Sequence, residues 1–76
     1  VRGNYQAAAS AFGVAYQDHP EGPKAVEAML KLGLSLSLMG QGGDACAVFS
    51  ELERRFPTAP ANVLQRSVQE RGRLGC

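Results

Sequence analysis

Apolar residues recur along this chain with the 3.6-residue period of an α-helix, and the pattern stops three times at proline or glycine. We expect four helices, over residues 5–18, 23–39, 44–56 and from 60 to about 72. Pro20 and Pro57 end the first and third segments, and the glycine-rich stretch from Gly40 to Gly43 ends the second. The apolar and small residues of the four stripes are Tyr5, Ala8, Ala9, Phe12, Ala15 and Tyr16; Val26, Met29, Leu30, Gly33, Leu36 and Ser37; Ala45, Val48, Phe49, Leu52 and Phe56; and Val63, Leu64 and Val68.

The second segment also alternates leucine with other residues from Leu32 to Leu38, which is the pattern of a strand. The stripe through Met29 and Gly33 favours a helix that is covered on more than one face. The last segment has one weak apolar face, which is typical of a helix that caps an array.

A spaced set of residues recurs at an interval of 37 positions. The pairs are Gly3 and Gly40, Ala8 and Ala45, Phe12 and Phe49, Pro20 and Pro57, and Pro23 and Pro60. A period of this length is typical of stacked helical hairpins. The sequence therefore predicts an all-α array, and such arrays usually bind other proteins.

The segment from Met29 to Pro57 resembles a tetratricopeptide repeat. The family's positions are filled by Met29, Leu32, Gly33, Leu36, Ala45, Phe49 and Pro57. Two positions depart from the family: Met29 replaces the usual tryptophan, and Leu52 stands where a small residue is common. The resemblance implies a right-handed superhelix of hairpins in one domain over residues 1–76. Residues 1–20 would be the second half of one repeat, 23–57 a full repeat and 60–76 a C-terminal capping helix.

The proline-rich links after residues 19 and 56 look like those of the bacterial envelope branch of this family. Within that branch, the segment from Leu30 to Pro60 is similar to the C-terminal domain of the Tol–Pal system protein YbgF, also called CpoB. That likeness implies a periplasmic, non-catalytic adaptor that binds TolA, and a peptidoglycan synthase as a further partner, during cell division. Outer-membrane assembly lipoproteins of the BamD type have similar links and provide the alternative.

In tetratricopeptide arrays the first helix of each repeat lines the concave groove. The resemblance places the partner-binding groove on Glu27, Leu30, Leu34, Ser37, Leu38, Leu64, Ser67 and Arg71. Leu30, Leu34 and Leu38 are four residues apart, so they form one ridge that suits an amphipathic helix or an extended segment. The alternative is that neighbouring helices cover these leucines.

The two cysteines, Cys46 and Cys76, stand near the start of the third segment and after the end of the fourth. If those helices pack antiparallel, these ends approach each other, and a disulfide would stabilise the fold by roughly 3 kcal/mol. An oxidising periplasm would permit the bond. The alternative is a buried Cys46 with a free Cys76 at a mobile terminus.

Catalytic, metal-binding and cofactor-binding motifs are missing from the sequence. His19 and two cysteines are too few for a zinc site, and the glycines after Met39 lack the lysine of a phosphate-binding loop. We therefore expect neither an enzyme nor a cofactor. Residues 1–52 carry a net charge of −2 and residues 53–76 one of +3, but the aromatic residues do not alternate with the arginines, so nucleic acid is not an expected partner.

No stretch is long and apolar enough to span a membrane. The chain begins in mid-repeat without methionine, so we expect a fragment of a longer protein. Its first apolar face, with Tyr5, Phe12 and Tyr16, would then be partly open, which predicts self-association.

Overall fold

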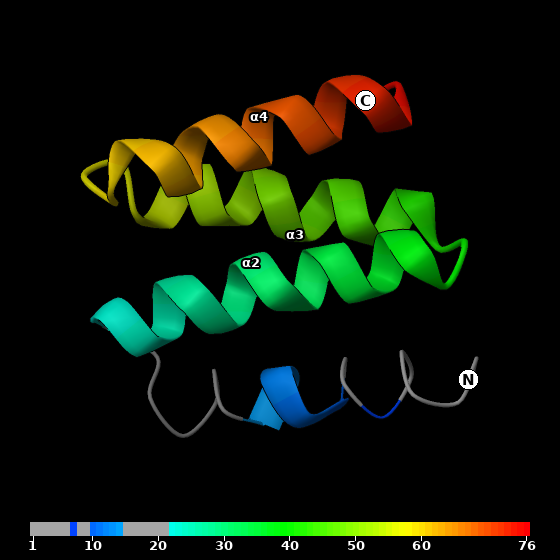
Figure 1. The fold of residues 1–76 in the computed structure, drawn as a ribbon, viewed down its shortest axis with the longest axis horizontal. Helices are drawn as coiled ribbons and strands as arrows, with labels where there is room; N and C mark the ends of the chain where they lie inside the picture. Colours follow the sequence, from blue (N-terminus) through cyan, green and yellow to red (C-terminus); the bar gives the residue numbers. More distant parts are fainter. Residues whose placement is uncertain (1–6, 8–9, 15–21) are drawn as a thin grey trace.

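The computed structural model describes residues 7, 10–14 and 22–76, and these residues form helices and turns without a β-strand. The helices are α2 (Pro23–Leu38), α3 (Gly42–Arg55) and α4 (Ala61–Leu74), and residues 10–14 are helical as well. Figure 1 shows α3 between α2 and α4, with neighbouring helices running in opposite directions. The predicted all-α fold of antiparallel hairpins is confirmed. Most of the helix expected at residues 5–18 lies outside the described residues.

Helix α2 has both ends where the sequence predicts them, within one residue. It begins at Pro23, which needs no hydrogen-bond acceptor in the first turn. At its end the amide of Gly40 donates to Ser37 and the amide of Gln41 donates to Leu36, a Schellman motif. This motif requires the left-handed backbone of Gly40, whose φ is 82°.

The bounds of α3 and α4 differ from the prediction by about two residues. Helix α3 begins at Gly42 instead of residue 44. The amides of the first helical turn have no acceptor within the helix, and glycine is tolerated there. Helix α4 continues to Leu74 instead of fading near Gly72, and Gly75 closes it with a φ of 81°.

The core lies between α2 and α3 and depends on one close approach. Gly33 of α2 faces the ring of Phe49 of α3, and a Cβ atom on Gly33 would lie 2.5 Å from the ring's Cε1. Val26, Met29 and Leu52 form the adjoining buried cluster, against which Val63 of α4 also packs. The stripe through Met29 and Gly33 therefore packs against α3.

Candidate functional site

The face of α2 that the sequence predicts as a binding surface is exposed at both of its ends. At one end Leu38 is 60% exposed, beside a half-buried Leu34. At the other end Nζ of Lys31 lies 2.7 Å from Oε1 of Glu27, and both side chains are largely in solvent. This face thus combines an apolar end with a charged end on one helix.

Two further residues of the predicted groove contact the neighbouring elements. Leu30 is half-buried and packs against the core cluster, so it belongs partly to the interior. The hydroxyl of Ser37 accepts a hydrogen bond of 3.3 Å from Nη2 of Arg73, which brings α4 beside α2 at this point. Solvent exposure along the predicted leucine ridge therefore rises from a half-buried Leu30 to an exposed Leu38.

Two of the three predicted groove residues of α4 are directed toward α3. Ser67 is fully buried, and its hydroxyl lies 2.7 Å from Oε2 of Glu53 in α3. Arg71 turns to the same carboxylate, since its Nε and Nη2 donate to the two oxygens of Glu53 at 2.8 Å each. Both residues therefore contact α3. Leu64, the third predicted residue, is half-buried.

Glu53 is the acceptor at the centre of this contact between α3 and α4. The paired hydrogen bonds from Arg71 lower the pKa of its carboxyl below the ordinary value of 4.5, against the opposing effect of partial burial. The hydroxyl of Ser67, which also lies 3.2 Å from the carbonyl oxygen of Phe49, lowers this pKa further. Glu53 is therefore ionised at neutral pH and accepts hydrogen bonds from two residues of α4.

Glu70 forms a second such centre within α4. Its side chain is 10% exposed, Arg66 donates to Oε2 at 3.1 Å, and Arg73 donates to Oε1. The hydrogen bond from Arg73 is the main cause of a lowered pKa, with Arg66 contributing and burial opposing. The spacing of these three residues, four and three apart, is a signal that sequence reasoning missed. The pairing of Glu53 with Arg71 had no such local signal.

These two carboxylates predict a loss of stability in acid. A folded-state pKa below 4.5 means that the contribution is complete above that pH and disappears as the pH falls through the lowered values. We expect the Tm, followed by circular dichroism, to fall as the pH is lowered from about 5 to about 2. The double variant Glu53→Gln/Glu70→Gln should start from a lower Tm and lose less of it over that range.

Glu27→Gln provides the matched control for this prediction. The pKa of Glu27 is also lowered, by the hydrogen bond from Lys31, but its side chain is 65% exposed. Solvent and salt weaken such a surface pair. The Glu27→Gln chain should keep most of the acid-dependent fall, and an unchanged fall in the double variant would contradict the role of Glu53 and Glu70.

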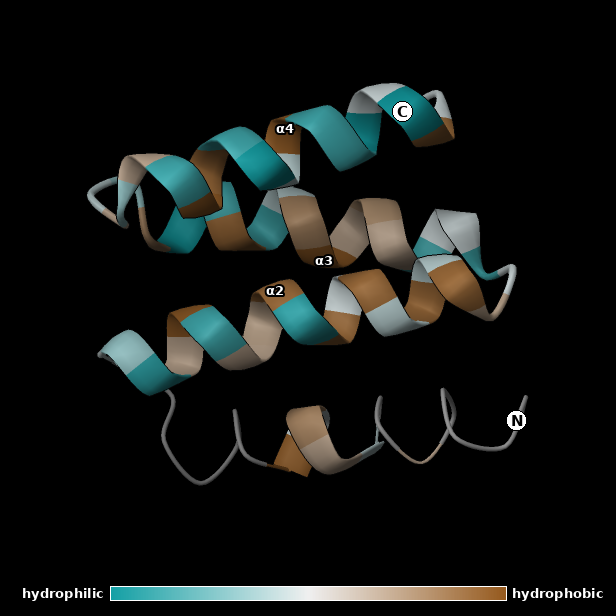
Figure 2. Cartoon of the chain, viewed as in Figure 1, coloured by the Kyte–Doolittle hydropathy of each residue, from teal (hydrophilic) through white to brown (hydrophobic). Residues whose placement is uncertain are grey.

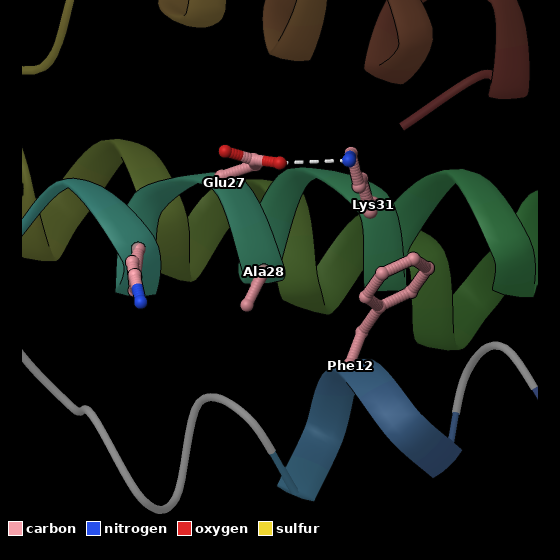
Figure 3. A pocket seen from close by; sticks show the side chains of 5 residues that line it. Phe12, Glu27, Ala28 and Lys31 are labelled. Carbon is pink, nitrogen blue, oxygen red and sulfur yellow. Dashed lines mark hydrogen bonds and ion pairs between the residues drawn. The ribbon is translucent and has the colours of Figure 1, made fainter.

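A cleft of about 250 Å³ opens between residues 10–14 and α2 (Figure 3). The described side chains that line it are Phe12, Lys24, Glu27, Ala28 and Lys31. Nζ of Lys31 lies 5.8 Å from the centre of the Phe12 ring, a distance at which a cation and an aromatic face attract. Phe12 is half-buried, while Tyr5 and Tyr16, the other aromatic residues of the predicted self-association face, lie outside the described residues. Self-association stays a prediction.

The predicted disulfide between Cys46 and Cys76 is confirmed. Their Cα atoms are 6.1 Å apart and their sequence separation is 30 residues. Gly75 makes the pairing possible because its left-handed turn lets the amide of Cys76 donate back to the carbonyl of Arg71. The chain thereby reverses after α4 and presents Cys76 to the start of α3.

Among the residues that the structure describes, no group of three His, Cys, Asp or Glu side chains is placed to hold a metal ion. None of the described helices is both long enough and apolar enough to cross a membrane.

The geometry defines a class of protein: stacked antiparallel helices in which a glycine of α2 and a buried phenylalanine of α3 fit together, the fold of a tetratricopeptide-like array. Residues 27–59 match the family model of the tetratricopeptide repeat. That segment contains most of α2, all of α3 and most of the following link. Comparison with curated proteins and with solved structures gave no match. The family match supports a module that binds other proteins.

Proposed function

We propose that this chain binds a helical or extended segment of a partner protein on the outward face of α2. The observation that carries the proposal is the exposed Leu38, beside the half-buried Leu34, at the end of α2. Residues 27–59 match the repeat, and α2 is its first helix, the one that lines the groove in tetratricopeptide arrays. A leucine that is 60% exposed on a well-packed helix gains free energy when a partner removes it from water. The charged pair of Glu27 and Lys31 lies farther along the same helix and would orient the partner.

The particular system that we propose is the Tol–Pal complex of the bacterial envelope. The chain would be the periplasmic adaptor that binds TolA and coordinates outer-membrane constriction with peptidoglycan synthesis. The sequence likeness of Leu30–Pro60 to YbgF supports this proposal. The disulfide is compatible with it, because such bonds persist in oxidising compartments such as the periplasm.

A calorimetric titration with the periplasmic helical segment of TolA tests both the binding surface on α2 and the Tol–Pal assignment. We expect saturable binding to the chain, and a loss of affinity of roughly tenfold or more in the Leu38→Glu variant, because a buried interface then receives an unpaired charge. Leu38 is better suited to this test than Leu34, whose half-buried side chain also contributes to packing.

Val68→Glu is the matched control, since Val68 is 51% exposed on α4 and undergoes the same change from an apolar side chain to a carboxylate. It should bind like the unchanged chain. Equal losses in both variants would contradict the α2 surface. A folded chain that does not bind TolA would contradict the Tol–Pal assignment and favour the alternative, a scaffold in an outer-membrane assembly lipoprotein of the BamD type.

A further inference from the structure

Helix α4 gains little from apolar burial. Its two buried side chains, Ser67 and Glu70, are both polar, whereas α2 and α3 bury residues such as Met29 and Phe49. The large apolar residues of α4 remain half-buried or, in the case of Val68, 51% exposed. Figure 2 shows the hydrophilic colour over most of α4. The hydrophobic effect therefore holds this helix more weakly than it holds the α2–α3 hairpin.

The polar contacts of α4 do not replace that missing burial. Ser67 and Arg71 bond to Glu53, and Arg73 bonds to Ser37. Each of these groups can form hydrogen bonds with water when α4 moves away from α3. Their net contribution to the free energy that keeps α4 on α3 is therefore modest. The Arg71 and Glu53 side chains, at 29% and 23% exposed, already contact solvent. These contacts determine where α4 lies along α3, but they contribute too little free energy to keep the helix there.

The disulfide closes the end of the α3–α4 pair that the chain leaves open. The link from Phe56 to Pro60 joins the two helices at one end, and Cys46 and Cys76 join them at the other. Leu74 lies at this end as well, where its Cδ2 is 3.6 Å from the place that a Cβ on Gly42 would occupy. With both ends fixed, α4 cannot leave α3 while the bond is intact.

We propose that the Cys46–Cys76 disulfide is a reversible latch, and that its reduction by a dithiol releases the C-terminal half of α4 from α3. Release would uncover the surface of α3 around Glu53 that Arg71 now covers.

The chemistry of the latch is a two-electron thiol–disulfide exchange. Cys76 is exposed and Cys46 is half-buried, so one thiolate of the dithiol attacks Sγ of Cys76. A mixed disulfide forms, and Cys46 leaves as a thiolate and takes up a proton. The second thiolate of the reductant then attacks the reductant's first sulfur, which is bonded to Sγ of Cys76. Cys76 leaves as a thiolate and is protonated in turn. The dithiol is oxidised to a cyclic disulfide and the chain gains two thiols.

Amide hydrogen exchange on the intact chain, with and without dithiothreitol, tests the latch. We expect amides in the last two turns of α4 to exchange at least about tenfold faster after reduction, and amides of α2 to change less than about twofold. The double variant Cys46→Ser/Cys76→Ser should match the reduced chain without any reductant. Removal of dithiothreitol under oxidising conditions should restore the original protection.

Ser67→Ala in the oxidised chain separates the latch from the polar network. It removes the buried hydroxyl and leaves the disulfide intact, so the protection of the last two turns should change less than about threefold. Unchanged protection of α4 after reduction would overturn the proposal, because the polar network would then hold the helix. A parallel loss of protection in α2, α3 and α4 would overturn it as well, because the bond would then stabilise the whole fold and not one helix.

Discussion

Replacing Gly33 with valine is expected to disrupt the hairpin of α2 and α3. A Cβ atom at this position would meet three ring atoms of Phe49, at 2.5, 2.8 and 2.9 Å, and no real side chain tolerates such contacts. Phe49 cannot move aside because it is fully buried. We expect a loss of about 3 kcal/mol or more in the free energy of unfolding. A chain of this size has roughly 4–11 kcal/mol in total, so the change should be plain in urea denaturation followed by circular dichroism.

Glycine-to-alanine changes at two positions provide the matched comparison. Gly72 lies within α4, and a Cβ there would have no atom within 4 Å. Gly72→Ala should therefore stabilise the chain by about 0.5–1 kcal/mol, since alanine favours the helix. The same change at Gly33 should destabilise. If both variants gained stability, the close fit of Gly33 and Phe49 would be wrong.

A double-mutant cycle assigns the effect to this one contact. Phe49→Ala alone should cost about 3–5 kcal/mol because it leaves a cavity. Combined with Gly33→Val, the valine methyl groups enter that space, so the loss should be smaller than the sum of the two single losses by about 1 kcal/mol or more. Strict additivity would mean that Gly33 acts through helix propensity and not through Phe49.

Both residues of this contact carry a local signal in the sequence. Gly33 and Phe49 occupy family positions, and a helical stripe on each side places both on the facing surfaces. The same periodicity locates α2, α3 and α4 to within about two residues. The errors fall at glycines, as in the first turn of α3 at Gly42, because glycine is compatible with both a turn and a first helical turn.

The position of α4 relative to α3 carries no such local signal. Leu64, Ser67 and Arg71 lie on one side of the helix by spacing, and the repeat pattern places that side in the groove. Ser67 instead faces α3, where it is buried beside Glu53. A polar residue at this spacing looks like part of a solvated face until its acceptor, 14 positions away in the chain, is known. The burial of Ser67 against α3 could therefore not be predicted from the sequence.

Leu52 and Met29 are the two departures from the repeat pattern, and the structure places them in one cluster with Val26. Where the family usually has tryptophan, this chain has the smaller Met29; where a small residue is common, it has the larger Leu52, which is fully buried. The volume lost at Met29 thus lies beside the volume gained at Leu52. We infer that the two departures compensate each other, which keeps the core filled at the density of a protein interior.

Leu52→Ala is accordingly expected to cost about 2–5 kcal/mol in urea denaturation, because it leaves a cavity among Val26 and Met29. Val68→Ala, at an exposed position of α4, should change stability by less than about 0.5 kcal/mol. Met29→Trp alone should also destabilise, by about 1–3 kcal/mol, because Leu52 already occupies the space that the larger ring needs. The double variant Met29→Trp/Leu52→Ala restores the family's usual pair, so it should be more stable than either single variant. A double variant that is weaker than both would show that the two positions do not share volume, and that another neighbour of Leu52 fills the place of the missing tryptophan.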